Sequence, residues 1–141
     1  MRINKFLARC GIGSRRKCDA LIKNRVVRVN NVILEDFSYE IKKNDVVLVN
    51  NKIAKPQPLI IYKLNKPKGF ISSVKDDKGR KCITDIVKSN KRLFPIGRLD
   101  FNTTGIILIT NDGEITNKLL HPRNMKKRIY IAETRNDIAL K

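Results

Sequence analysis

The chain has 141 residues, of which 41% are hydrophobic, and carries a net charge of +18. This apolar content can offset the entropy of ordering a compact chain, which argues against a disordered protein. No apolar run approaches the roughly 18 residues that a membrane span needs, and no apolar core follows the basic N-terminus, so we expect a cytoplasmic protein. The positive charge indicates a polyanionic partner, above all a nucleic acid.

The first 31 residues hold the densest positive charge, with nine basic side chains and one acidic one. Apolar residues spaced by three and four predict a short helix over residues 3–10. Ser14 is suited to cap a second helix, whose inner face contains Cys18 and Ile22 while its basic side chains stay in water. The N-terminal segment is therefore expected to dock a polyanion.

Short β-branched runs follow the two helices. The runs on either side of Asn30-Asn31 predict a hairpin over residues 26–34, because asparagine tolerates the left-handed conformation of a tight turn. A third strand is expected over residues 45–49. Together these elements predict a small α+β domain over residues 1–50, with two helices and a curved sheet.

A linker is expected over residues 51–58, because Pro56 and Pro58 cannot continue a helix or donate to a central ladder. Beyond it the apolar pattern predicts part of a mixed α/β domain over residues 59–141. We expect its strands over residues 59–64, 105–110 and 128–133, and its helices over residues 83–87 and 114–120. The fold class is thus α+β.

A polar loop between two apolar runs contains the sharpest candidate for chemistry. Asp100 lies there with Arg98 two residues before it, and a nearby arginine favours the charged form of a carboxylate. Such a carboxylate suits a nucleophile better than a proton donor. A structural Arg–Asp pair that stabilises a turn explains the same pattern, and the charge pattern alone does not separate the two interpretations.

Metal and disulfide chemistry find no support in the sequence. Cys10, Cys18 and Cys82 form no CxxC pair, and the chain has a single histidine. We expect all three cysteines to be buried and reduced, and we expect no zinc site.

Two series of motifs run through the chain in order. The first series is Asn4-Lys5-Phe6-Leu7, Gly11-Ile12-Gly13-Ser14-Arg15-Arg16, Val27-Arg28-Val29-Asn30 and Asp45-Val46-Val47. The second is Lys66-Pro67-Lys68-Gly69, Leu93-Phe94-Pro95-Ile96-Gly97-Arg98-Leu99-Asp100, Thr104-Gly105 and Thr110-Asn111-Asp112-Gly113-Glu114. Together they resemble the ribosomal RNA pseudouridine synthases of the RsuA/RluB type, which join an N-terminal S4 RNA-binding domain to a catalytic domain. The family's catalytic domain continues well past the segment around Tyr130, so the resemblance implies a C-terminally incomplete one here.

The resemblance implies roles for three residues. Asp100 corresponds to the family's catalytic aspartate, which isomerises uridine in RNA to pseudouridine with no cofactor and no metal. Arg98 is expected to fill the space left by the displaced uridine or to pair with Asp100. Tyr130 corresponds to an aromatic residue that stacks on the target base, a role that suits any base pocket. Arg128 stands where the family has lysine, which keeps the charge but changes the donor shape.

The S4 portion supplies the candidates for phosphate contacts, which position RNA without reading its sequence. They are Arg2, Lys5, Arg9, Arg15, Arg16, Lys17 and Arg28. The expected partner is ribosomal RNA or a ribosomal precursor particle. We expect the protein to be a monomer and not to bind a membrane.

Three functions remain open on the sequence. The first is an active synthase, for which the context of Asp100 and His121-Pro122 favours large-subunit ribosomal RNA. The second is a non-enzymatic S4-type RNA-binding protein or an inactive truncated synthase. The third is a ribosome-assembly or translation-stress factor built on the S4 domain, which leaves the residues after position 59 without a role.

Overall fold

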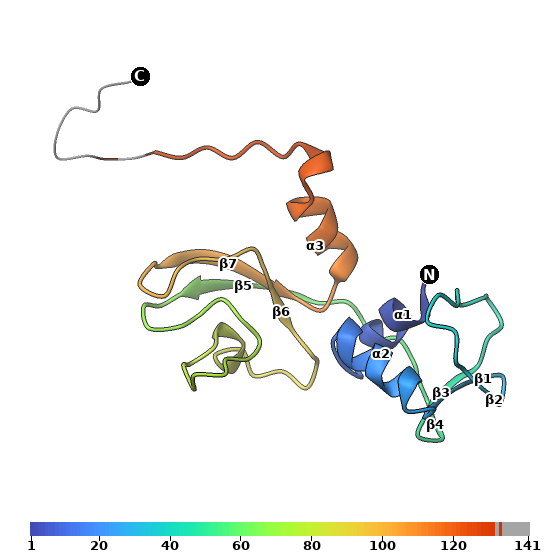
Figure 1. Cartoon of the computed structure of the whole chain (residues 1–141). Helices are drawn as coiled ribbons and strands as arrows, with labels where there is room; N and C mark the ends of the chain where they lie inside the picture. Colours follow the sequence, from blue (N-terminus) through green and yellow to red (C-terminus); the bar gives the residue numbers. More distant parts are fainter. Residues whose placement is uncertain (132, 134–141) are drawn as a thin grey trace.

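The computed structural model describes residues 1–131 and 133, so the end of the second predicted domain lies outside the described residues. The chain forms two units, each with its own antiparallel sheet and its own apolar core (Figure 1). This arrangement confirms the predicted α+β fold. Within the described residues, no helix is long and apolar enough to cross a membrane.

The N-terminal unit contains two helices and four short strands. They are α1 (Ile3–Arg9), α2 (Arg15–Lys23), β1 (Val27–Val29), β2 (Val32–Ile33), β3 (Val47–Val49) and β4 (Lys52–Ile53). The strands pair in the order β2-β1-β3-β4, and every neighbouring pair is antiparallel. One helix–sheet core holds the unit together, with Ile3, Leu7, Cys18, Ile22, Val27, Val29, Leu34, Val47 and Val49 buried.

Ser14 starts α2 as predicted. Its hydroxyl accepts a hydrogen bond from the backbone N–H of Lys17 at 3.2 Å, which satisfies one of the free donors of the first turn.

Replacing Ser14 with alanine is expected to lower the free energy of unfolding by about 1 kcal/mol, because the N–H of Lys17 loses its side-chain acceptor. Chemical denaturation measures the change. Ser14→Asp supplies another acceptor and is expected to preserve stability; equal losses in both variants would show that the cap contributes nothing.

Two Asn-Asn turns close both hairpins of this sheet. Asn30 and Asn31 have φ of 51° and 68°, and Asn50 and Asn51 have φ of 48° and 63°. Positive φ at both central residues gives the turn twist that matches right-handed strands. The first hairpin confirms the prediction, whereas the second places β4 inside the segment predicted as linker.

The second unit is built on a three-stranded sheet in the order β5-β7-β6. Its elements are β5 (Ile61–Lys66), the 3-10 helix η1 (Ile83–Asp85), β6 (Phe94–Ile96), β7 (Gly105–Thr110), α3 (Gly113–Leu120) and the 3-10 helix η2 (Pro122–Asn124). The buried core consists of Ile83, Leu93, Ile107 and Ile109. The strand over 105–110 and the helix near 114–120 are confirmed, the helix over 83–87 is a single 3-10 turn, and β6 was not predicted.

Two strands begin later than predicted, and side chains explain both shifts. The backbone N–H of Ile60 donates to the Asn111 side chain at 2.9 Å, so the β5 ladder starts at Ile61. The N–H of Val46 donates to the Asn30 side chain at 2.9 Å, so β3 starts at Val47. In both places the side chain of a turn residue takes the donor that a ladder would otherwise use.

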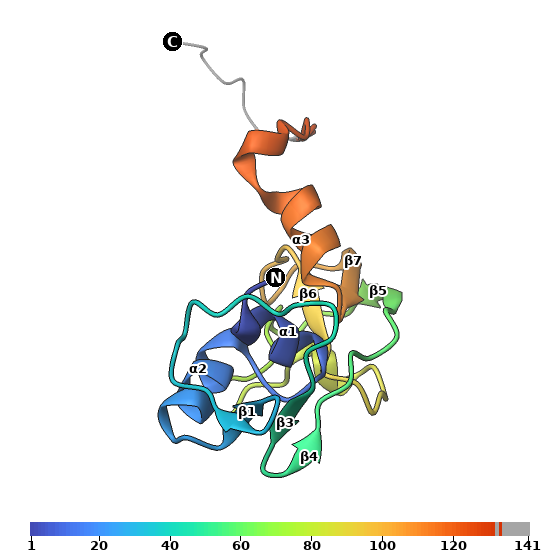
Figure 2. The same cartoon turned by 90° about the vertical axis from the view of Figure 1, so that its right-hand side faces the viewer.

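The strand predicted over residues 128–133 is wrong for the described part of that segment, which is irregular. Ile129 and Ile131 are 88% and 96% exposed, and no described strand pairs with them. An extended segment becomes a strand only when a neighbour takes its backbone hydrogen bonds. In both views the described segment after η2 lies apart from β5 and β7 (Figures 1 and 2).

The two units touch through α1. Lys5 pairs with Glu114 at the start of α3 at 2.9 Å, and the backbone N–H of Gln57 donates to the carbonyl of Arg9 at 3.1 Å. The side chains of Lys5 and Glu114 are 42% and 63% exposed, so solvent screens the ion pair and it contributes little stability. Its consequence is that Lys5 already has a carboxylate partner within the protein.

Candidate active site

The loop between β6 and β7 carries Asp100. Gly97 leaves β6 with φ of +82° and Gly105 begins β7 with φ of +133°, backbone conformations that side chains disfavour. The carbonyl of Asp100 accepts a hydrogen bond from the N–H of Thr103 at 3.0 Å, which tightens the loop into a turn. The loop thus leaves the sheet sharply and returns to it sharply, with Asp100 exposed at its bend.

Ser72 fixes the residue between Arg98 and Asp100. Its hydroxyl donates to the carbonyl of Leu99 at 2.7 Å and accepts from the N–H of Leu99 at 3.0 Å. Leu99 also packs against the core of the second unit. The backbone that presents Arg98 and Asp100 is therefore held from both sides.

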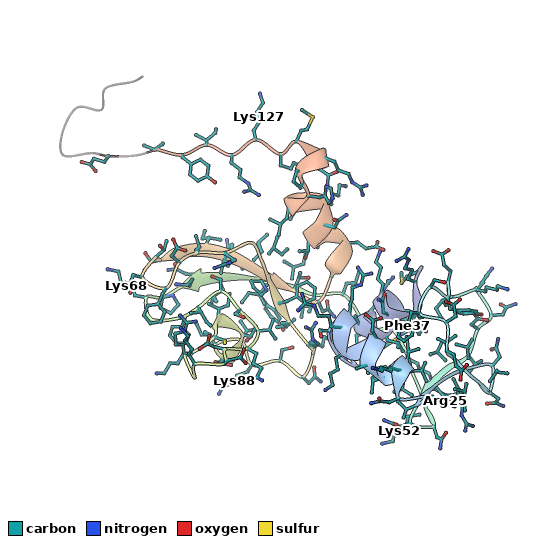
Figure 3. All side chains as sticks on the ribbon, viewed as in Figure 1. Arg25, Phe37, Lys52, Lys68, Lys88 and Lys127 are labelled. Carbon is teal, nitrogen blue, oxygen red and sulfur yellow. The ribbon has the colours of Figure 1, made fainter. Side chains whose placement is uncertain are left out.

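Lys66 holds the part of the same loop that follows Asp100. Its side chain is fully buried, and its nitrogen donates to the carbonyls of Thr103 at 2.7 Å, Pro67 at 3.1 Å and Phe101 at 3.2 Å. A buried lysine is tolerated only where such acceptors replace water. Of the two lysines in the motif Lys66-Pro67-Lys68-Gly69, Lys66 is therefore bound to the loop, and only Lys68 reaches the surface (Figure 3).

An open hollow of about 440 Å³ lies beside Asp100. Its polar lining comes from two loops, the one after β5 and the one between β6 and β7. It consists of two arginines, two aspartates and two serines: Ser72, Ser73, Asp76, Arg80, Arg98 and Asp100. Apolar surface from Ile71, Leu99 and Phe101 completes it. A polar hollow with an exposed carboxylate is suited to a polar ligand.

Asp76 and Arg80, which both line this hollow, form an ion pair with each other. The arginine donates from Nη2 at 2.8 Å and from Nε at 3.1 Å to the carboxylate. These side-chain hydrogen bonds, together with that from the backbone N–H of Arg80, hold the pKa of Asp76 well below its usual range. Asp76 therefore stays ionised and is not suited to serve as a general acid or base for a substrate.

The predicted site residues are brought together only in part. Arg98 and Asp100 line one hollow, but they form none of the ion pairs found between described residues. Tyr130 is 81% exposed and does not line the hollow, and its role as a stacking residue stays a prediction. Ser72, Asp76 and Arg80 were not predicted, although an acid four residues before an arginine, with Gly79 between them, is a signal for a turn that closes an ion pair.

The basic residues of the S4 portion lie on α1, α2 and β1, and all of them except Lys5 are exposed. Arg2 and Arg9 lie at the ends of α1, Arg15, Arg16 and Lys17 at the start of α2, and Arg28 on β1. Further lysines and arginines are exposed on both units, such as Arg25 and Lys52 on the first and Lys68 and Lys88 on the second (Figure 3). Positive charge is thus presented on both units rather than on one.

The cysteines are free thiols. Cys18 and Cys82 are buried as predicted, whereas Cys10 is only partly buried. Burial raises the pKa of all three, that of Cys10 to about 11, so they are poor nucleophiles at neutral pH. Among the residues that the structure describes, no cluster of three or more acidic, cysteine or histidine side chains is placed to hold a metal ion.

Comparison with known proteins places both units. Residues 1–47 match the S4 domain, and residues 60–141 match the RNA pseudouridylate synthase family. The chain is 41% identical over 136 residues to "Ribosomal large subunit pseudouridine synthase B" of Bacillus subtilis, covering 95% of this chain and 55% of that protein. It is 40% identical over 135 residues to an "Uncharacterized RNA pseudouridine synthase" of Aquifex aeolicus, covering 94% and 54%.

A solved structure, "Crystal structure of pseudouridylate synthase", matches 88% of this chain and 54% of its own at 26% identity, with a TM-score of 0.48. The chain spans about half the length of the curated relatives that it matches. The family match covers more than half of the chain, including the loop of Asp100 and the hollow beside it. The chain therefore belongs to the RNA pseudouridylate synthase family and carries an S4 domain at its N-terminus.

Proposed function

We propose that the protein isomerises a uridine of ribosomal RNA to pseudouridine, with Asp100 as the catalytic carboxylate and Arg98 beside it. The observation that carries the proposal is the placement of Arg98 and Asp100 on one polar hollow in a chain of this family. The relative from Bacillus subtilis is named for the large ribosomal subunit, which favours large-subunit RNA as the substrate. As expected from the sequence, we propose that the protein acts as a cytoplasmic monomer and that its partner is ribosomal RNA or a ribosomal precursor particle.

The reaction needs no redox partner. The bond between N1 of the base and C1′ of the ribose breaks, the base turns, and a bond between C5 and C1′ forms; C5 loses a proton and N1 gains one. A carboxylate assists by trapping or stabilising the electron-poor sugar, or by adding to the base. The uridine must leave its stack to expose these atoms, which an open hollow permits.

The test is pseudouridine mapping on unmodified large-subunit and small-subunit ribosomal RNA transcripts incubated with the protein. The proposal expects a new pseudouridine at a defined position, with the large-subunit transcript as the substrate. RNA that is bound but gains no pseudouridine would contradict it and favour the non-enzymatic S4-type RNA-binding protein.

RNA binding is expected to depend steeply on salt, because the basic side chains displace counterions from phosphates. Replacing Arg15, Arg16 and Lys17 together by glutamine is expected to reduce the slope of log affinity against log salt by about 2 to 3. Asn24→Gln, at the other end of α2, changes no charge and serves as the control. A triple variant with the original slope would show that the start of α2 does not contact phosphate.

A further inference from the structure

The hollow that Asp100 lines contains a second carboxylate, Asp76, that the proposed reaction does not use. The side chain of Asp76 is only 8% exposed. It accepts hydrogen bonds from the backbone N–H of Arg80 at 2.9 Å and of Lys78 at 3.1 Å, besides two from the Arg80 side chain. These four bonds satisfy the carboxylate inside the protein, so it is free neither to take a proton nor to bind a cation.

Arg80 has the opposite character. Its side chain is 48% exposed and lines the same hollow as Asp100. A guanidinium has five N–H donors, and the hydrogen bonds to Asp76 use one from Nε and one from Nη2. The remaining donors are available to a ligand, and Asp76 fixes the plane in which they point.

A fixed guanidinium edge is chemically suited to a phosphate. Arginine binds phosphate oxygens through parallel hydrogen bonds, and an arginine already held in place loses little side-chain entropy on binding. A uridine within RNA carries one phosphate on each side of its ribose. When its base and sugar face Asp100, these phosphates lie within one nucleotide of the hollow that Arg80 also lines.

We propose that Arg80, oriented by Asp76, binds a phosphate that flanks the target uridine while Asp100 faces its sugar and base. The inference rests on the proposed function in taking uridine in RNA as the occupant of the hollow. Arg80 is thereby a substrate-binding residue and Asp76 a positioning residue that acts through it.

Uridine and uridine 3′,5′-bisphosphate are the probes, with binding to the full chain followed by calorimetry and by the NMR signal of the Arg80 Nε–H group. Wild type is expected to bind the bisphosphate about 10-fold or more tightly than uridine, and only the bisphosphate should shift the Arg80 signal. Arg80→Gln is expected to remove the preference, and Arg80→Lys to retain part of it.

Lys75→Gln is the matched control, because it removes one positive charge from the same loop at a side chain that is 86% exposed and does not line the hollow. It is expected to retain the preference for the bisphosphate. A preference that is absent from wild type, survives Arg80→Gln or disappears in Lys75→Gln would overturn the proposal. The wild-type NMR titration decides the matter even where Arg80→Gln fails to fold.

These binding data, together with the pseudouridine mapping on ribosomal RNA, separate this inference from the proposed function. A phosphate preference through Arg80 in a protein that forms no pseudouridine would sink the isomerase proposal alone. Pseudouridine formation with no contribution of Arg80 to the phosphate preference would sink this inference alone.

Discussion

Replacing Asp100 with asparagine is expected to lower the rate of pseudouridine formation by about 10³-fold or more, because the amide has nearly the same shape but cannot serve as an anionic nucleophile or stabilise positive charge. Asp100 is exposed and only its backbone carbonyl takes part in the hydrogen bonds of the loop, so the fold should be unaffected. Single-turnover kinetics at saturating protein measure the chemical step, and the RNA dissociation constant is expected to stay within about twofold of wild type, since base and phosphate contacts remain.

Asp77→Asn is the control for this substitution. Asp77 lies on the neighbouring loop, its side chain is 95% exposed and it does not line the hollow. The control is expected to isomerise RNA at the wild-type rate. An Asp100→Asn variant that keeps the wild-type rate would remove Asp100 from the chemistry, whereas equal losses in both variants would point to a general effect of charge.

The second large effect is expected from Lys66. Replacing Lys66 with methionine keeps most of its length but removes the hydrogen bonds to the carbonyls of Pro67, Phe101 and Thr103, of which only that of Phe101 keeps another donor, the N–H of Gly69. We expect the free energy of unfolding to fall by about 3 kcal/mol, because three hydrogen bonds from a buried charged side chain are lost. The rate of pseudouridine formation should fall by about 10²-fold, because the loop that presents Asp100 loses its anchor.

Lys63→Met tests whether the effect belongs to this position. Lys63 lies on the same strand, β5, but is exposed. It is expected to change the free energy of unfolding by less than about 0.5 kcal/mol and to leave the rate unchanged. If Lys66→Met unfolds like wild type by chemical denaturation, the three hydrogen bonds do not hold the loop.

Local signals in the sequence predict the N-terminal unit well. Helical spacing of apolar residues gives α1, the Ser14 cap gives the start of α2, and the Asn30-Asn31 turn gives the first hairpin. The same Asn-Asn signal at Asn50 was interpreted as a linker because two prolines follow it. The turn residues decide the structure there, and the prolines lie beyond the end of β4.

The second unit is less predictable because its order depends on contacts between distant residues. β6 is only three residues long and contains Pro95, so the sequence shows no strand pattern there; its pairing with β7 makes it a strand. The segment after η2 has the apolar residues of a strand but no described partner. The apolar pattern alone therefore predicted a strand where no described strand is available to pair with it.

In the candidate site too, residues that are close in the sequence can be predicted together, whereas contacts between distant residues cannot. Arg98 and Asp100 are neighbours in one loop, so the sequence can place them together. Lys66 and Ser72 reach that loop across 37 and 27 positions of the chain, and only the folded sheet brings them there. The supporting residues of the site are therefore invisible to motifs, whereas the residue proposed for the chemistry is visible.

Formation of the bond between C5 and C1′ requires the loss of hydrogen from C5 of the uridine, so this loss is the most direct sign of the proposed isomerisation. The measurement is the release of tritium to water from ribosomal RNA labelled at C5 of its uridines, with wild type and Asp100→Asn compared at equal RNA occupancy. The account predicts release with wild type and none above background with the variant. RNA that is fully bound by wild type and releases no tritium would contradict it.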